Sequence, residues 1–345
     1  MRGRVHDMFV ALQERYAAAL DEYIEEQLTL VPADTPQLAN MVRYPLGLVD
    51  GNGRPAVASR GKRIRPVLLL LTNEAAGGNW NAAVPAAAAV EFLHNFSLVH
   101  DDIQDNSPTR RGRPAVWKLW GRSQGINVGD LLFALSFSCL RGLGRRGVAA
   151  GVRLATGDAL TESCLELTRG QYLDLHFEDC NSVTMDHYLS MISGKSAALL
   201  STCARIGALL AGASSERVGH FASFGKNLGM AFQIRDDYLG LWGEPSLTGK
   251  SSATDLRSRK KTLPVLFGIQ HSNRFAEMHR KPPDPDEDVS LFLALLEESG
   301  AREFAQMQVE QWSLAARQSL IAAEPASSAG STLHIVLDQL LLRDL

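Results

Sequence analysis

The sequence has little of what marks several common protein classes. Its 345 residues include four cysteines, Cys139, Cys164, Cys180 and Cys203, which are far apart and lack the spacing of a metal site or a disulfide framework. Three of them, Cys139, Cys164 and Cys203, lie in apolar helix-like segments and are predicted to be buried free thiols of a reducing compartment. The net charge of −3 excludes the strongly basic balance that favours non-specific nucleic-acid binding.

Long apolar runs are also missing. A membrane-spanning helix needs about 18 or more consecutive apolar residues. The longest candidate here, 131–140, is interrupted by serines and predicts a buried helix. The first 28 residues mix charged and apolar residues at helical spacing, unlike the apolar core of a signal peptide. We expect a soluble, cytoplasmic protein without a membrane span.

Strand-like alternation does not persist anywhere, and no repeat of 20–50 residues stands out. Helical periodicity recurs instead, and the breaks between its segments carry proline and glycine. Helices are predicted at about 5–29, 62–77, 82–105, 124–143, 150–178, 185–213, 215–240, 263–271, 288–300 and 302–323. We therefore expect one all-α domain over 1–345, with its helices packed around a common centre.

Paired aspartates close one of the apolar helices. Asp101 and Asp105 stand four residues apart, so both carboxylates lie on one helix face and repel each other. A divalent cation reverses that repulsion, and carboxylate oxygens suit magnesium. Three arginines follow at 110, 111 and 113, and arginine suits phosphate recognition. The segment predicts a site for a magnesium-bridged diphosphate, and the alternative is a solvated acidic helix end.

The same design occurs a second time. Asp236 and Asp237 close another apolar helix, and Lys250, Lys260 and Lys261 follow in the next loop. The repetition makes two unrelated charged helix ends the weaker interpretation.

Other basic residues lie outside the two aspartate-rich segments. Lys62 and Arg65 are three apart at a predicted helix start, where they can converge on one anion, although ordinary surface charge is the favoured interpretation of this segment alone. Lys195 lies in an apolar stretch, so it either reaches the surface or faces a polar ligand. His94, two turns before Asp101, is either a ligand or a hydrogen-bonded core residue.

Together these segments resemble the trans-isoprenyl diphosphate synthases, the polyprenyl synthetase family. The resemblance covers about 60–265, in the family's order. The matching motifs are GKRIRP (61–66), EFLHNFSLVHDDIQD (91–105), RRGRP (110–114), GQYLDL (170–175), GKSAAL (194–199), FQIRDDYLG (232–240), TGK (248–250) and KKTLP (260–264).

The resemblance implies an isoprenoid-synthase helical bundle around a central cavity, a homodimer, and an enzyme that joins an allylic prenyl diphosphate to isopentenyl diphosphate. It implies three Mg²⁺ ions per active site, held by Asp101, Asp105 and Asp236, with Asp102 and Asp237 in supporting positions. The implied site for the allylic diphosphate consists of Arg110, Lys195, Lys260 and Lys250. The implied site for isopentenyl diphosphate consists of Lys62, Arg65, His94 and Arg111. Ser196 and Gln233 would lie near the reacting allylic carbon, and Lys195, Gln233 and Lys260 would be catalytic.

Three positions concern departures from the family's motifs and the length of the product. The second motif has Gly240 where the family's third aspartate stands, and Arg259 replaces the glycine before the last lysine. Phe96 stands five positions before Asp101, where a bulky residue in the family limits product length, although it could equally be a core aromatic. No residues are inserted within 101–105, so the segment resembles C20 synthases more than bacterial C15 synthases. Geranylgeranyl diphosphate is the expected product.

Other functions remain open. A class I terpene cyclase of the same fold would need the aspartates but not the isopentenyl diphosphate site. A non-catalytic subunit of a heteromeric synthase would be expected to lose one aspartate motif. A binding module for another diphosphate would not need two metal sites.

Overall fold

The computed structural model describes residues 2–56, 61, 63–180, 182–243, 256, 259–281 and 289–341. Helices make up almost all of this part of the chain, and its only sheet is an antiparallel pair, β1 (Thr109–Arg110) and β2 (Arg113–Pro114). The predicted all-α fold is therefore confirmed. Two predicted site residues, Lys62 and Lys250, lie outside the described residues.

The predicted helices are present, with ends shifted by a few residues. They are α1 (Arg2–Leu28), α3 (Ile64–Ala75), α4 (Trp80–Gln104), α6 (Arg122–Cys139), α7 (Arg141–Arg145), α8 (Ala150–Asp179), α9 (Met185–Ile192), α10 (Ala198–Leu210), α11 (Ser215–Trp242), α14 (Leu263–His271), α16 (Val289–Glu298) and α17 (Ala301–Ala322). Helices that were not predicted are α2 (Pro36–Arg43), α5 (Val116–Trp120), α15 (Asn273–His279) and α18 (Ser327–Leu341).

The chain divides into two compact units. The first contains 1–160, 203–218 and 325–333, and the second contains 161–202, 219–324 and 334–345. Boundaries between the units fall inside α8, α10, α11 and α18. The prediction that residues 1–345 form a single domain stays a prediction.

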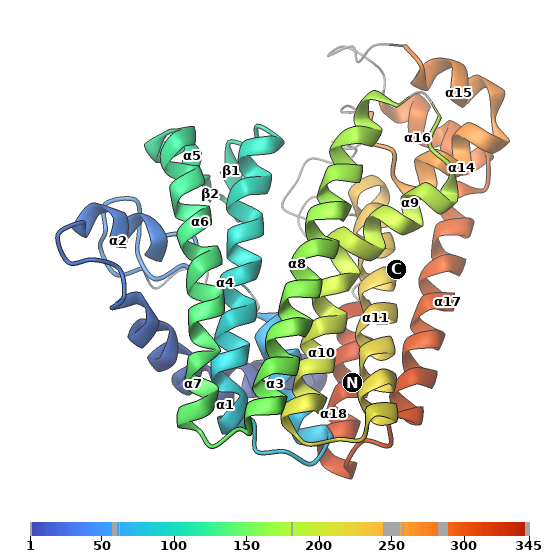
Figure 1. Cartoon of the computed structure of the whole chain (residues 1–345). Helices are drawn as coiled ribbons and strands as arrows, with labels where there is room; N and C mark the ends of the chain where they lie inside the picture. The colour runs from blue at the N-terminus through green and yellow to red at the C-terminus, as the bar shows by residue number, and fades with distance from the viewer. Residues whose placement is uncertain are drawn as a thin grey trace. The chain divides into compact units, whose positions relative to one another are not determined.

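Helix α4 is the centre of the first unit. Its middle is rich in alanine and fully buried, with Ala86, Ala87, Ala88 and Ala89 all at 0% exposure. Small side chains allow close packing, and α4 runs side by side with α6 (Figure 1) and also packs against α3 and α1. The Asn79 side chain accepts a hydrogen bond from the backbone N–H of Asn81 at the start of the helix. The carboxyl end of this core helix positions the first aspartate pair.

In the second unit, α9 passes into one π-helical turn, η1 (Ser193–Ala197), before α10 begins. The turn widens the backbone at Lys195 and Ser196, and π-helical turns occur frequently at functional sites. Gly170 of α8 lies directly against it, because a Cβ atom at Gly170 would be 2.1 Å from the backbone nitrogen of Lys195. This close approach explains why the two motifs at 170 and 194 begin with glycine.

All four cysteines are free thiols. Cys139 and Cys203 are buried as predicted, and burial raises the pKa of Cys203 to about 12. Cys164 was expected to be buried but is only partly so.

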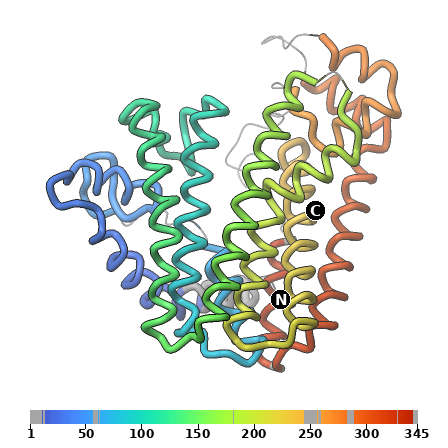
Figure 2. Tube along the Cα trace, in the orientation of Figure 1, coloured from blue at the N-terminus to red at the C-terminus, as the bar shows by residue number. Residues whose placement is uncertain are grey.

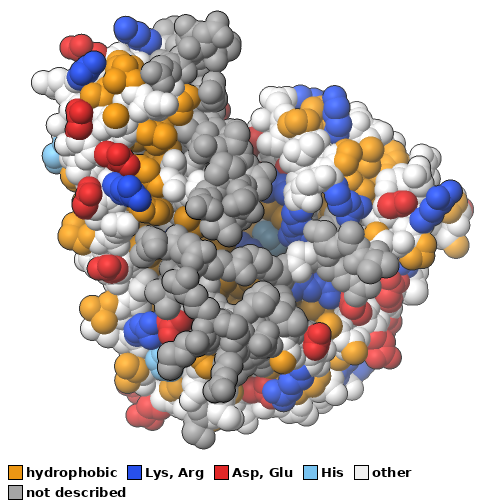
Figure 3. All heavy atoms as spheres, turned by 180° about the vertical axis from the view of Figure 1, so that it is seen from behind, with side chains coloured by type: hydrophobic (Ala, Val, Ile, Leu, Met, Phe, Trp, Pro, Cys, Tyr) orange, Lys and Arg blue, Asp and Glu red, His pale blue; other side chains and the backbone are white. Residues whose placement is uncertain are grey.

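Two helical stretches, Trp80–Gln104 and Arg122–Arg145, are long and apolar enough to cross a membrane. The first is a core helix with 72% of its most apolar window buried, and the second has 44% buried. Two such helices are weak evidence for a span. On the face seen in Figure 3, hydrophobic side chains lie among charged ones of both signs.

Candidate active site

The aspartates at the end of α4 have different surroundings. Asp101 has a side chain that is 17% exposed, Asp102 is almost fully buried at 4%, and Asp105 is exposed. Successive residues of a helix differ by about 100° in direction, so Asp101 and Asp105 share a face that Asp102 leaves. The first two predicted metal ligands are therefore accessible together, whereas Asp102 points into the protein.

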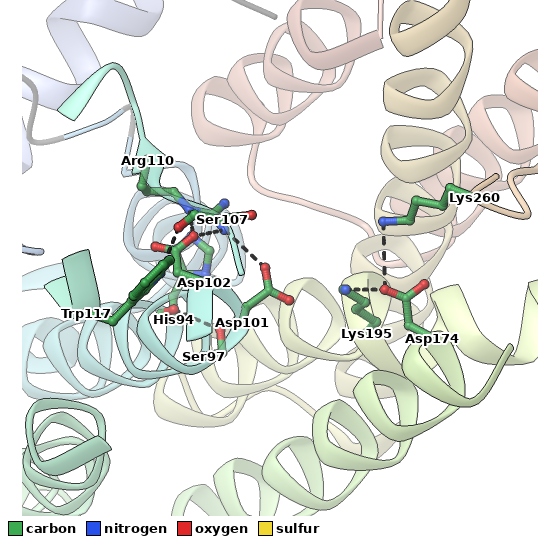
Figure 4. Close-up of polar contacts among 10 residues, drawn as sticks. All are labelled: His94, Ser97, Asp101, Asp102, Ser107, Arg110, Trp117, Asp174, Lys195 and Lys260. Atoms are coloured by element: carbon green, nitrogen blue, oxygen red, sulfur yellow. Dashed lines mark hydrogen bonds and ion pairs between the residues drawn. The ribbon is translucent and has the colours of Figure 1, made fainter. Parts of the chain in front are cut away.

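Asp102 is bound by an arginine from the hairpin β1–β2. Arg110 donates from Nε and Nη2 to Oδ1 of Asp102 at 2.9 and 2.6 Å, and from Nη2 to Oδ2 of Asp101 at 3.1 Å (Figure 4). Burial raises the pKa of Asp102, and the Arg110 guanidinium opposes that shift. Arg110 therefore forms ion pairs with both neighbouring aspartates.

The hairpin turn explains how three neighbouring arginines take different directions. Arg110 pairs with Arg113, so the turn consists of Arg111 and Gly112, with φ values of 53° and 72°. Such a two-residue turn requires positive φ at both positions, which glycine adopts without strain. The guanidinium of Arg111 lies against Gly61. That of Arg113 stacks on the Tyr44 ring at 3.9 Å and donates to the carbonyl of Val49, so it supports the hairpin.

Arg65 and His94 lie together in the same unit. Nη1 of Arg65 is 3.0 Å from Nε2 of His94. Because arginine can only donate, Nε2 accepts and the imidazole carries its proton on Nδ1. Burial, reinforced by Arg65, Arg111 and Arg110, holds the pKa of His94 well below its usual range. His94 is therefore a neutral hydrogen-bonding group at pH 7, not a cation.

A pocket of about 430 Å³ lies beside this first group of residues. Asp102, Arg110 and Arg111 line it, together with Asn95 of α4 and Tyr44. The predicted residues Arg65, His94, Asp101, Asp102, Asp105, Arg110 and Arg111 all belong to the first unit.

In the second unit, two predicted lysines converge on a carboxylate that was not predicted. Lys195 donates to Oδ2 of Asp174, and Nζ of Lys260 lies 3.8 Å from the same oxygen (Figure 4). Burial alone would raise the pKa of Asp174, but Lys260 and Lys195 outweigh it and hold the pKa below its usual value. Asp174 belongs to the GQYLDL motif, where an acidic residue between two leucines was the available signal.

Ser196 and Gln233 are also in contact in the second unit. Ser196 donates from Oγ to Oε1 of Gln233, and Nε2 of Gln233 donates to Oδ1 of Asp237 at 2.9 Å. The buried hydroxyl of Tyr188 donates to Oδ2 of Asp237 at 2.6 Å. These residues line a pocket of about 290 Å³ together with Asp174, Lys195 and Lys260. Asp236 is exposed beside the buried Asp237.

Magnesium fits the chemistry of these donors. Among the described residues, no group of three histidine, cysteine, aspartate or glutamate side chains forms a complete cation site. Magnesium is usually held by one or two carboxylates together with substrate phosphates and water, so such a group is not required. Asp101 and Asp105 on one helix face, and the exposed Asp236, offer the oxygen ligands this requires.

Phe96 lies in an aromatic cluster between α4 and α6. Its ring centroid is 5.0 Å from that of Phe133 and 4.9 Å from that of His100. Phe137 extends the cluster along α6, 5.2 Å from Phe133. The backbone trace in Figure 2 shows the two helices running alongside each other. Phe96 is therefore half-buried against a neighbouring helix, on a different face of α4 from Asp101.

The helical fold and these two groups of charged residues were compared with families of known proteins. The family model described as polyprenyl synthetase matches residues 50–296. The chain belongs to this family.

Relatives within the family differ in product. The chain is 44% identical over 236 residues to a (2E,6E)-farnesyl diphosphate synthase of Mycobacterium tuberculosis, a match covering 68% of this chain and 64% of the relative. It is 39% identical over 311 residues to a geranylgeranyl diphosphate synthase of the same organism, covering 89% and 86%. Thus the chain spans 64% of the length of the farnesyl relative.

Solved structures agree with the fold. The crystal structure of a polyprenyl synthetase from Streptomyces coelicolor A3(2) matches with a TM-score of 0.88 and 33% identity, covering 96% of this chain and 99% of that one. A geranylgeranyl pyrophosphate synthetase from Pyrococcus horikoshii Ot3 matches at 0.86 and 32%, covering 99% and 100%.

Proposed function

We propose that this protein is a trans-prenyltransferase that condenses an allylic prenyl diphosphate with isopentenyl diphosphate. The observation that carries the proposal is the group formed by Arg65, His94 and Arg111, which is present in addition to the aspartates and their basic partners. An enzyme that ionises a single diphosphate has no use for this second group. The names of the relatives support the same reaction.

The proposed reaction begins when the C–O bond of the allylic substrate breaks and its electron pair leaves with diphosphate. Bound magnesium would neutralise the charge that develops on the leaving group. We assign Arg110, Lys195 and Lys260 to holding this diphosphate, because fixed cationic groups stabilise developing negative charge. Lys250 is assigned to the same diphosphate from the sequence.

The second half of the reaction joins the substrates. Lys62, Arg65, Arg111 and neutral His94 are assigned to holding isopentenyl diphosphate, whose double bond attacks the allylic carbon. The new cation then loses a proton to the departing diphosphate. Ser196 and Gln233 are assigned to the allylic carbon, where oxygen atoms favour positive charge.

We further propose that Asp101, Asp105 and Asp236 bind Mg²⁺, with three ions per site. Calorimetric titration with Mg²⁺ and a non-reactive allylic diphosphate analogue measures that number. A stoichiometry of one ion would contradict it.

Geranylgeranyl diphosphate is the proposed product. The uninterrupted segment 101–105 and the longer match to a geranylgeranyl diphosphate synthase favour it. Farnesyl diphosphate is the second candidate, because the farnesyl relative has the higher identity over its shorter match.

One experiment tests the reaction and its alternatives. The protein is incubated with Mg²⁺, isopentenyl diphosphate and dimethylallyl, geranyl or farnesyl diphosphate in turn, and the dephosphorylated products are separated by chromatography. Condensation to a C20 alcohol is expected. A cyclic hydrocarbon formed without isopentenyl diphosphate would identify a cyclase, and activity only with an added second protein would identify a non-catalytic subunit.

We also propose a cytoplasmic homodimer that buries part of α6. Ile126 and Phe133 of this helix are 46% and 36% exposed, and segment 131–140 carries more apolar surface than one helix stripe needs. A monomer in light scattering at micromolar concentration would reject the dimer, and recovery only in the membrane fraction would reject the cytoplasmic location.

A single cooperative unfolding transition is expected if both units form one domain.

A further inference from the structure

Four polar side chains form one hydrogen-bonded series in the second unit. It runs from Tyr188 on α9 through Asp237 and Gln233 on α11 to Ser196 in the π-helical turn. We call these four residues the Tyr188 series. Tyr188 is 1% exposed and Asp237 is 6% exposed, so the series is shielded from water at its Tyr188 end. All four residues line the pocket that also contains Lys195, and Ser196 and Gln233 are the less buried of the four.

The chemistry of the donors gives the series a direction. An ionised carboxylate can only accept hydrogen bonds, so Asp237 takes one from the Tyr188 hydroxyl and one from the Gln233 amide. The nitrogen of that amide is therefore turned toward Asp237, and its oxygen is turned toward Ser196. The orientation of Gln233 is thus fixed by Asp237, and that of Asp237 by Tyr188.

Asp237 differs in burial from its neighbour Asp236. Asp236 is exposed, whereas Asp237 is buried with a protein donor on each carboxylate oxygen. The same division occurs in the first unit, where Asp101 is accessible and Asp102 is buried against Arg110. In each pair, the second aspartate is the more buried one.

We propose that Tyr188 and Asp237 are positioning residues, which hold the Gln233 carbonyl oxygen and the Ser196 hydroxyl toward the reacting allylic carbon. This inference rests on the proposed function. It assigns Asp237 a role other than the supporting position at the metal that the family resemblance implies, and it adds Tyr188, for which the sequence offered no signal.

The orientation matters because an amide is a dipole. Its oxygen end stabilises a neighbouring positive charge, whereas its NH₂ end opposes one. Asp237→Asn is expected to reverse Gln233, because the Tyr188 hydroxyl, which keeps its donor role, donates to the new carbonyl. The new NH₂ group then faces Gln233, which turns its own oxygen to accept. The NH₂ group of Gln233 would then face Ser196.

The test uses Tyr188→Phe and Asp237→Asn, with Tyr238→Phe as the matched control. The Tyr238 hydroxyl is also buried on α11, but it bonds Arg302 and Gln306 of α17 instead of lining the pocket. We expect both test variants to lower kcat by roughly 10–100-fold, as loss of a supporting hydrogen bond does in metal sites, while both KM values change less than about threefold. The control is expected to keep its kcat within about twofold. Because the two residues act in series, the double variant should be no slower than Asp237→Asn alone.

Binding separates positioning from metal ligation. Calorimetry with Mg²⁺ and inorganic diphosphate should show weakened binding for Asp236→Asn and near wild-type binding for Asp237→Asn. Equal losses in these two variants would overturn the inference, and so would a Tyr188→Phe enzyme as fast as the control.

The proposed function can fail separately. A wild-type protein that condenses no primer would reject the prenyltransferase, but a crystal structure of Tyr188→Phe would still test the positioning. Gln233 is expected to leave Ser196 in that variant, and an unmoved Gln233 would reject the inference.

Discussion

Arg110 and Asp102 are joined by two hydrogen bonds, which attach the hairpin β1–β2 to the carboxyl end of α4. The same guanidinium reaches Asp101, so one arginine contacts both neighbouring aspartates. Asp102 is buried and Asp101 is accessible, which predicts different results when each carboxylate is removed.

Asp101→Ala and Asp105→Ala should abolish turnover with little change in helical signal or melting temperature, because removing one of two like charges on a helix face does not destabilise it. Circular dichroism and a product assay check this. Asp102→Ala is the matched comparison: it removes two of the three hydrogen bonds of Arg110 to the aspartates and leaves only the bond to Asp101, at a cost of about 1.5–3 kcal/mol in unfolding free energy. If Asp101→Ala or Asp105→Ala unfolds or stays active, the assignment to magnesium is wrong.

Lys62→Ala and Arg65→Ala should raise the KM for isopentenyl diphosphate far more than the KM for the allylic substrate. Loss of one charge-assisted contact is expected to cost about 1.5–3 kcal/mol. Steady-state kinetics with each substrate varied in turn measures the difference. Arg43→Ala, which removes an arginine paired with Glu25 outside these residue groups, should leave both KM values unchanged. Equal effects on both substrates would mean that the two diphosphate sites have been exchanged.

The ion pairs of Asp174 are expected to make the free energy of unfolding fall at acid pH. The pKa of Asp174 is lower in the folded protein than its ordinary 3.8, because Lys260 and Lys195 outweigh the effect of burial. Its contribution is therefore present above pH 3.8 and is lost as the pH falls through the lower folded value. Asp174→Asn should lose about 1.5–3 kcal/mol near pH 7 and show a flatter decline in melting temperature below about pH 4. Parallel curves for both proteins would show that the ion pair contributes nothing.

The sequence predicted most helices because apolar periodicity is a local signal that survives burial. The short helices α2, α5 and α15 have too few turns to show it. Within the site, spacing along one helix predicted that Asp101 and Asp105 share a face. Spacing could not reveal that Asp174 joins Lys195 and Lys260, or that Tyr188 binds Asp237, because these contacts depend on packing between helices. The π-helical turn at 193–197 was equally invisible, since it is held by the approach of Gly170 from another helix.

The aromatic cluster of α4 and α6 bears on product length. Phe96 stands five residues before Asp101, so it lies about 7–8 Å along the helix axis from the proposed metal ligand. It is half-buried and in contact with Phe133. The ring faces α6, so a prenyl chain that extends from the aspartates between α4 and α6 would meet it, and Phe133 would limit its movement.

Phe96→Ala should therefore lengthen the product at similar total turnover, because truncation removes most of the ring volume and leaves the carboxylates in place. A core role predicts the opposite pattern, with a loss of about 3–5 kcal/mol in stability and no change in product. Phe92→Ala is the matched control, since Phe92 lies one turn earlier on α4 and is fully buried. Phe92→Ala should lose stability and leave the product unchanged. Chromatography of the dephosphorylated products and a melting curve of each variant separate the two outcomes, and a destabilised Phe96→Ala enzyme with unchanged product would remove Phe96 from chain-length control.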